Sequence, residues 1–260
     1  MDTSSSGGLS SGPFTSIDGV DARYRMRIGD VTNALQAHFG ESESKLPNDV
    51  GAIKAKQSWG MAYTGEYHNA TVHIGYESTY VTLKGLKTIF DGFRQFGPEG
   101  IVLADKYDVD SRPLSVITVG ARYDPGQWFV MGEWSHLDSQ GSFFGNGTGW
   151  YLSGGYRFGE FTPYITYAQA KADNLSDPGL AAPAAAGLNA TLNSLLSAKP
   201  VQNTVSIGGR WDFMRNVALK LQYDHTDISA GSSGVLTNLQ PGFQSGGKVD
   251  VFSATIDFVF

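Results

Sequence analysis

Apolar and polar residues alternate one by one along most of this sequence, and this period of two constrains the fold more than any other feature. Between positions 217 and 224, Val, Leu, Leu and Tyr alternate with Ala, Lys, Gln and Asp. Such a pattern predicts a β-strand with one face in apolar surroundings and the other in water. About eleven segments share it: 20–28, 31–39, 55–63, 70–76, 117–123, 128–134, 150–158, 161–167, 205–213, 217–223 and 252–260. Helical periodicity is scarce, so the sequence predicts an all-β fold.

The connections between these segments alternate between short and long along the whole chain. The short ones are Gly29-Asp30, 64–69, Asp124-Pro125-Gly126, Gly159-Glu160 and Met214-Arg215. The long ones are 40–53, 80–112, 138–147, 170–202 and 226–248. A transmembrane β-barrel has short turns at one end and long loops at the other, whereas a soluble sandwich has no reason to separate them. The pattern therefore predicts an antiparallel transmembrane β-barrel.

The apolar face of the expected strands carries aromatic residues near both ends and aliphatic residues between them. Near the short turns we expect Tyr63, Tyr123, Trp128, Phe158, Phe161, Trp211, Phe213 and Phe258; near the long loops, Phe39, Tyr76, Trp134, Trp150, Tyr167 and Tyr223. Two aromatic belts around an aliphatic band are typical of a barrel surface in lipid. The opposite face is rich in Arg, Lys, Asp, Glu, Gln, Ser and Thr, which are unsuited to a dry core.

Composition excludes several other classes. The chain has no cysteine, so it forms neither disulfides nor thiolate metal sites. Its net charge of −6 argues against nucleic acid as a partner. No apolar run reaches the roughly 18 residues of a membrane helix. The first residues, Met1 to Ser6, do not have the basic and apolar regions of a signal peptide.

Three passages resemble Gram-negative outer-membrane general porins: Asp18 to Asn33, Phe161-Thr162-Pro163-Tyr164, and Val251 to the terminal Phe260. The resemblance corresponds to the C-terminal two-thirds of such a porin. It implies a passive channel for ions and small hydrophilic solutes in the bacterial outer membrane, in contact with outer-membrane lipid. It also implies a homotrimer, and selection by the barrel-assembly machinery through Phe260.

Strand directions lead to an expectation about missing strands. The first and last strands both end on the short-turn side, so a closed sheet would place them parallel. Bacterial barrels close antiparallel with even strand numbers, so an odd number of strands is absent. Five more would complete the sixteen that the family resemblance implies. We therefore expect residues 1–260 to form a single barrel domain without its N-terminal strands, with 1–16 as the remnant of an external loop.

Charged residues on the polar face are the expected lining of the pore. The basic ones are Arg23, Arg25, Arg27, Lys54, Lys56, Arg122, Arg157, Arg210 and Lys220; the acidic ones are Glu77, Glu133, Asp212 and Asp224, together with Asp21 and Asp257. Such charges set a local potential that favours counter-ions. The most distinctive of these charges form an arginine ladder: Arg23, Arg25 and Arg27 place three guanidinium groups on one face of one strand. In the family it faces acidic residues of an inward-folded loop, which would lie in or before residues 1–16; alternatively, it pairs with Asp21 or with neighbouring strands.

Two long connections contain helical patterns. Leu83, Leu86, Ile89, Phe90 and Phe93 fall on one side of a helix, as do Leu188, Leu192, Leu195 and Leu196. Such helices would form a lid over the channel mouth, or they would lay their apolar sides on the barrel rim; we favour the rim.

Two alternatives to a channel remain. A barrel enzyme resembling outer-membrane phospholipases would use a histidine on the lipid-facing side, and His136 and His225 have that parity. A non-conducting structural or adhesive barrel would bind a partner through its loops. The five histidines do not have metal-ligand spacing, and neither a nucleophile elbow nor a phosphate-binding loop is present, so we expect neither catalysis nor a cofactor.

Overall fold

The computed structural model describes residues 18–45, 51–197, 199–236 and 242–258, and its dominant element is a single antiparallel sheet. Each strand pairs with its neighbours in the sequence, in the order β1 to β11. The strands are β1 (Asp18–Ile28), β2 (Val31–Lys45), β3 (Ala52–Tyr67), β4 (Ala70–Lys84), β5 (Arg112–Tyr123), β6 (Trp128–Asp138), β7 (Gly147–Tyr156), β8 (Phe161–Ala172), β9 (Gln202–Met214), β10 (Val217–Ile228) and β11 (Gly247–Phe258). The expected eleven antiparallel strands are confirmed.

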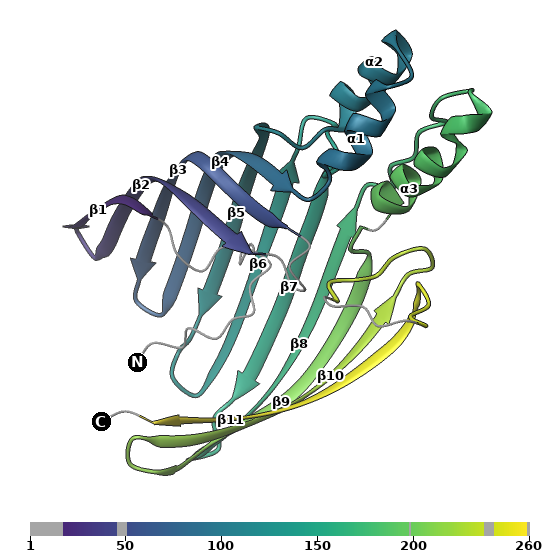
Figure 1. Ribbon diagram of the computed structural model, residues 1–260. Helices are drawn as coiled ribbons and strands as arrows, with labels where there is room; N and C mark the ends of the chain where they lie inside the picture. Colours follow the sequence, from purple (N-terminus) through teal and green to yellow (C-terminus); the bar gives the residue numbers. More distant parts are fainter. Residues whose placement is uncertain (1–17, 46–50, 198, 237–241, 259–260) are drawn as a thin grey trace.

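The sheet is strongly curved. Figure 1 shows β1 to β4 on one side and β9 to β11 on the other, so that the strands enclose a trough. Within the described residues, β1 pairs only with β2, and β11 pairs only with β10. These two strands are therefore the edges of the sheet. Residues 1–16, expected to be a loop remnant, and Phe260 lie outside the described residues.

Short turns join the strands at one end of the trough, and the long connections lie at the other end, as expected. Several strands extend further than predicted. β2 and β3 extend to within six residues of each other, and the next turn consists only of His68 and Asn69. A cross-strand ion pair stabilises the longer β2 and β3, because the Nζ atom of Lys54 lies 2.5 Å from the carboxylate of Glu43. Polar residues continue the strand pairing beyond the point where the apolar alternation ends.

Three helices stand beyond the long-connection end of the sheet: α1 (Lys87–Arg94), α2 (Pro98–Tyr107) and α3 (Ala186–Ser197), the last preceded by the short 3-10 helix η2 (Pro183–Ala185). We refer to residues 86–109, 139–146 and 175–197 as the helical cap. The sequence predicted α1 and α3 but not α2. Among the helices in the described part of the chain, none combines the length and the apolar composition that a membrane crossing requires.

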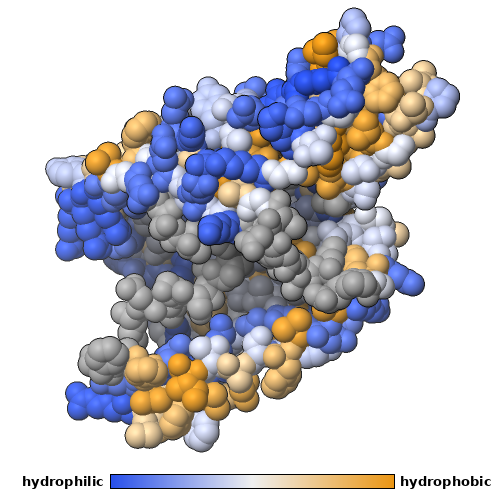
Figure 2. Space-filling view, viewed as in Figure 1, coloured by the Kyte–Doolittle hydropathy of each residue, from blue (hydrophilic) through white to orange (hydrophobic). Residues whose placement is uncertain are grey.

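The apolar sides of the cap helices pack against one another, not on the rim of the sheet as we expected. Phe90 and Phe93 of α1 are fully buried together with Leu192 and Leu196 of α3. Leu103 and Tyr107 of α2 and Phe143 of the 139–146 connection complete the same cluster. Figure 2 shows apolar surface between the helices at this end of the molecule. The cap is thus a small folded unit with its own core, built from three connections.

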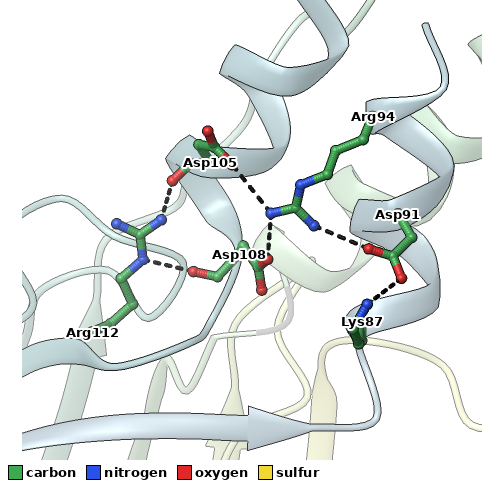
Figure 3. A network of polar contacts seen from close by, with 6 residues as sticks. All are labelled: Lys87, Asp91, Arg94, Asp105, Asp108 and Arg112. Atoms are coloured by element: carbon green, nitrogen blue, oxygen red, sulfur yellow. Dashed lines mark hydrogen bonds and ion pairs between the residues drawn. The ribbon is translucent and has the colours of Figure 1, made fainter. Parts of the chain in front are cut away.

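An arginine at the centre of polar contacts joins α1 to α2 (Figure 3). The Arg94 guanidinium lies 2.6 Å from a carboxylate oxygen of Asp108, 3.1 Å from Asp105 and 3.2 Å from Asp91. Hydrogen bonds to Asp108 and then Asp105 raise the pKa of Arg94 above its usual range. Arg112, at the start of β5, donates to the backbone carbonyl of Asp108 at 2.6 Å and so links this network to the sheet.

A second polar junction connects the other side of the cap. The Asp177 carboxylate accepts hydrogen bonds from Lys106 at 2.8 Å and Tyr107 at 2.9 Å, both on α2. The backbone of Asp177 makes two hydrogen bonds with the side-chain amide of Asn193 on α3. Asn189, one turn earlier, does the same with the backbone of Leu180. The side-chain amides of Asn189 and Asn193 therefore hold the backbone of Asp177 and Leu180 against α3.

Lys199 joins three of the long connections. Its Nζ atom donates to the backbone carbonyl of Phe143 at 2.6 Å, and its own carbonyl accepts from the Ser232 hydroxyl at 2.5 Å. Lys199 is only 8% exposed, and this burial lowers its pKa to about 8. The connections after β6, β8 and β10 are thereby held together at one buried lysine.

Candidate functional site

The two faces of the sheet differ sharply in chemistry and in exposure. Leu35, Leu152 and Ile207 on the apolar face are about half exposed, with values of 46%, 54% and 57%. Their neighbours on the polar face, such as Ala34 and Ser206, are buried. Side chains crowd together on the inside of a curve and spread apart on the outside, so the polar face is the concave one. The concave face is the candidate functional surface, and each strand supplies alternate residues to it.

The outer, convex face carries the expected aromatic belts. Near the short turns, Tyr123 and Trp128 have ring centroids 5.4 Å apart, and Trp211 and Phe213 are 5.3 Å apart. At the other end, Trp150 and Tyr167 are 5.4 Å apart. Paired rings of this kind present apolar area to lipid near an interface, and the polar tips of Trp150 and Tyr167 donate to Gln169 and Asn203.

The arginine ladder lies on the concave face of β1, and one of its members pairs with the wall of the trough itself. Arg25 donates to the Glu66 carboxylate on β3 at 2.8 Å, reaching across β2. Arg27 donates to the carbonyl of Gly29 at 3.1 Å. Asp21, considered as a partner of the ladder, instead accepts from Gln36 at 2.8 Å. Arg25 therefore pairs with the second strand from its own, not with Asp21 or the adjacent strand, and the sequence did not single out Glu66.

A compact ion cluster lies at the short-turn rim. Arg157, in the turn after β7, donates twice to Asp124, at 2.7 and 2.8 Å, and Arg122 donates to the same carboxylate at 2.6 Å. The hydrogen bonds from Arg157, and then those from Arg122 and the Gly126 backbone, hold the pKa of Asp124 well below its usual range, although burial works in the opposite direction. Sequence reasoning identified both arginines but missed Asp124, because that residue lies in a turn.

Charges on β9 to β11 also pair along the concave face. Arg210 donates to Asp212 at 2.8 Å and to Asp257 on β11 at 3.2 Å. The Lys220 ammonium lies 5.4 Å from the centre of the Tyr164 ring. Asp224 accepts from Gln222 at 2.8 Å. Both signs of charge therefore line this part of the wall, with partners on the same strand or two strands away.

Two expected pore-lining residues, Lys54 and Lys56, lie on the other face. A bulge between Lys56 and Trp59 inserts one extra residue in β3, and Gln57 takes a positive φ of 50° there. One extra residue exchanges the two faces of a strand. Lys54 and Lys56 consequently share the face of Trp59, and the prediction for them is wrong. Alternation read directly from the sequence does not reveal the bulge.

Glu77 and Glu133 are on the concave face of β4 and β6, as expected, and each lies near a histidine. The Nε2 atom of His73 is 3.1 Å from the carboxylate of Glu133. The imidazole of His38 and the side chain of Glu77 both lie over Gly60. Sequence reasoning did not connect these groups, because their partners are far apart along the chain.

The two histidines considered for catalysis lie on the outer face. His136 stacks on Trp134, and its Nδ1 atom is 3.2 Å from the Thr148 hydroxyl. The Nδ1 atom of His225 lies 2.6 Å from Asp250, which also accepts from Tyr223. Within the described residues, no serine is a hydrogen-bond partner of either histidine, and no group of three His, Asp or Glu is placed to hold a metal ion.

Comparisons with known proteins agree with this architecture. A family model described as Gram-negative porin matches residues 2–231. The structure is similar to the outer membrane channel DcaP of Acinetobacter baumannii, with a TM-score of 0.51, 11% identity, and coverage of 91% of this chain and 62% of DcaP. Salmonella typhi OmpF, solved in complex with daunomycin, gives a TM-score of 0.49 at 12% identity, covering 91% of this chain and 61% of OmpF. The chain thus spans about three fifths of these two proteins. No curated protein sequence matches it.

Proposed function

Since the chain belongs to the Gram-negative porin family, which places it in the bacterial outer membrane, we propose that its concave face lines a water-filled channel for passive diffusion of ions and small hydrophilic solutes. The observation that carries the proposal is the contrast between the two faces of one sheet. Charged and hydroxyl side chains line the inside of the curve, and half-exposed aliphatic and aromatic residues cover the outside. Only a sheet with lipid outside and water inside stabilises both faces at once.

A closed wall requires further strands between β1 and β11. The two edge strands run in the same direction, because ten successive antiparallel pairings separate them. Antiparallel closure therefore needs an odd number of additional strands, and unpaired edges are not tolerated in lipid. We propose five such strands N-terminal to β1, which makes a barrel of sixteen.

We further propose that the protein assembles as a homotrimer in contact with outer-membrane lipid, and that the barrel-assembly machinery recognises Phe260. An isolated barrel and a trimer differ in mass in a neutral detergent, so light scattering on the extracted protein distinguishes them. Deletion of Phe260 is expected to leave the protein unassembled and sensitive to proteases, while an added loop epitope tag leaves assembly intact.

The arginine ladder provides a test of the lining. Removing the three charges of Arg23, Arg25 and Arg27 makes the local potential more negative, which favours cations. We expect the variant Arg23→Gln/Arg25→Gln/Arg27→Gln to shift the reversal potential in a KCl gradient toward the potassium equilibrium potential. A matched change of Lys54 and Lys56 to Gln, on the other face, should leave it unchanged. Equal shifts in both variants would contradict the assignment of faces.

Diffusion of solutes is tested directly by swelling of vesicles that contain the full-length protein. We expect neutral sugars to enter at rates that fall steeply with molecular size and do not saturate with concentration. Saturable uptake would contradict passive diffusion, and no uptake of any sugar would favour a non-conducting adhesive barrel. We also propose that the protein is not an enzyme: the His136→Ala/His225→Ala variant should have the same effect on lipid as the wild type, namely none.

A further inference from the structure

On the concave face, His73 reaches across a glycine to an acid two strands away. The register pairs His73 on β4 with Gly120 on β5, and Gly120 with Glu133 on β6. The imidazole lies directly over the glycine, because a Cβ atom at position 120 would be 2.1 Å from Cε1 of His73. The absence of a side chain at Gly120 therefore gives the imidazole its path to the carboxylate, at 3.1 Å.

The same arrangement occurs a second time, two strands earlier. His38 on β2 pairs with Gly60 on β3, and Gly60 pairs with Glu77 on β4. A Cβ atom at position 60 would be 2.4 Å from Cε1 of His38 and 3.1 Å from Cγ of Glu77. On its other side, His38 pairs with Asp21 of β1. Each histidine on the concave face is thus placed beside carboxylates.

The charges around the two histidines are balanced. Cross-strand pairing arranges the concave residues of β1 to β6 in rows. We call four successive rows the histidine wall: the first contains Asp21 and Glu77, and the last contains Arg27 and Arg122. Besides the histidines, its charged residues are Arg23, Arg25, Arg27 and Arg122, and Asp21, Glu66, Glu77 and Glu133. The next strand adds a tyrosine, Tyr151, opposite Glu133. Four arginines facing four carboxylates leave a formal charge of zero while both imidazoles are neutral.

We propose that His38 and His73 are specificity-determining residues that make the ion preference of the channel depend on pH. The inference rests on the channel function proposed above. Imidazoles gain a proton between about pH 8 and pH 5, so acidification turns the balanced wall into one with two excess positive charges. Glu133 and Glu77 remain beside the new charges. The total charge of the wall nevertheless rises, whether or not each histidine is in contact with its glutamate. A positive wall attracts anions and repels cations.

The chain supplies its own matched control, since it has five histidines in three environments. His38 and His73 face the trough, His136 and His225 lie on the outer face, and His68 lies in a turn with its ring 4.2 Å from Tyr67. The five histidines are thus distinguished by their position. Replacement by glutamine keeps a polar side chain and removes the titration.

The test is the reversal potential of the full-length protein in planar bilayers under a KCl gradient, measured at about pH 8 and about pH 5. For the wild type we expect the chloride-to-potassium permeability ratio to rise by about twofold or more on acidification. His38→Gln/His73→Gln should lose at least half of this rise, while His136→Gln/His225→Gln should retain it. The single variant His73→Gln, expected to lose part of the rise, serves if the double variant does not assemble.

The possible failures are distinguishable. A pH response that is equal in the wild type and in His38→Gln/His73→Gln, or no response in the wild type, would overturn the assignment of the histidines and leave the channel proposal in place. No conductance at either pH would overturn the channel proposal and this inference with it.

Discussion

Glycines on the concave face determine which side chains can cross a strand. Gly120 and Gly75 are both concave glycines on adjacent strands, but their surroundings differ. A Cβ atom at Gly120 would collide with His73, whereas one at Gly75 would meet only the carbonyl oxygen of Met61, at an ordinary 3.9 Å. An alanine at position 120 must therefore displace the imidazole from Glu133.

This difference gives a prediction for a pair of conservative variants. Gly120→Ala should separate His73 from Glu133 but leave the pH-dependent ion preference in place, because His73 adds its charge to the wall in either position. It should have a small cost in stability, because a side chain can rotate away. Gly75→Ala should change neither property. The measurement is the reversal potential at the two pH values used above, with urea unfolding as the check on stability. Loss of the pH response in Gly120→Ala would contradict this and show that the response depends on the contact of His73 with Glu133.

Asp124 at the short-turn rim gives a prediction about stability. Asp124→Asn removes the carboxylate that Arg157 and Arg122 share, and we expect it to lower the free energy of unfolding by about 2 kcal/mol at neutral pH. Asp30 is a control, because its partner Arg27 is 3.8 Å away and both side chains are largely exposed. Asp30→Asn should lower the free energy of unfolding by less than about 0.5 kcal/mol. Urea titration of the protein in lipid vesicles measures both values.

The dependence of this effect on pH follows from the lowered pKa of Asp124. A carboxylate whose pKa is lower in the folded state stabilises the fold at pH values above the ordinary pKa of about 3.9, and this contribution is lost as the pH falls through the folded-state pKa. The difference between wild type and Asp124→Asn should therefore persist from neutral pH to about pH 4 and disappear only in stronger acid. A difference that vanishes near pH 6 would contradict the ion cluster.

At the scale of single residues, the sequence predicted faces better than partners. Alternation placed Arg25, Glu77 and Glu133 correctly, since a strand fixes the side of each residue. It failed for Lys54 and Lys56, because one inserted residue in β3 reverses the faces. The pairing of Arg25 with Glu66 depends on the register between strands, and no local pattern encodes it.

At the scale of elements, the helical cap is a folded unit with its own core, and its stability is separable from that of the sheet. Phe93 is fully buried in that core, while Val102 on α2 is 70% exposed. Phe93→Ala should therefore open the cap, at a cost of about 3–5 kcal/mol, and Val102→Ala should not. Trypsin cleavage at Lys87, Arg94 and Lys106 reports the opening. Loss of strand protection together with the cap would show that the two are one cooperative unit.

Lys199 gives the cap junction a pH dependence of its own. Its pKa is lowered to about 8 in the folded state, against about 10.4 in an unfolded chain. Between these values only the unfolded junction binds the proton, so the folded junction gains stability with rising pH, by up to about 1.4 kcal/mol per pH unit. Lys199→Met should abolish this rise. Protease protection of the junction, compared between the two proteins at each pH, measures it; parallel curves would contradict the burial of Lys199 as its cause.

The sequence predicted strands more accurately than helices, for a physical reason. A period of two is imposed on every strand by the contrast between lipid and water, so it survives in short segments. Helix α2 begins at Pro98, directly after Gly97, and exposes Ile101 and Val102 on one side, so its apolar pattern is too weak to identify. The packing of α1 against α3 depends on contacts between separate connections and was therefore missed.

At the scale of the whole molecule, the proposed channel requires a curved sheet that separates lipid from water. The family match and the eleven-stranded sheet support the channel. Mean composition does not reveal such a sheet, because alternating apolar and polar residues average to a mild hydropathy. Strand direction shows only that an odd number of strands must be added to these eleven to close the barrel. It does not give that number.

The most direct test of the central claim is the single-channel conductance of the full-length protein in a planar bilayer. A water-filled pore should give discrete current steps whose size rises in proportion to the conductivity of the bathing salt. Protein that inserts in the bilayer and gives no steps in any salt would contradict it.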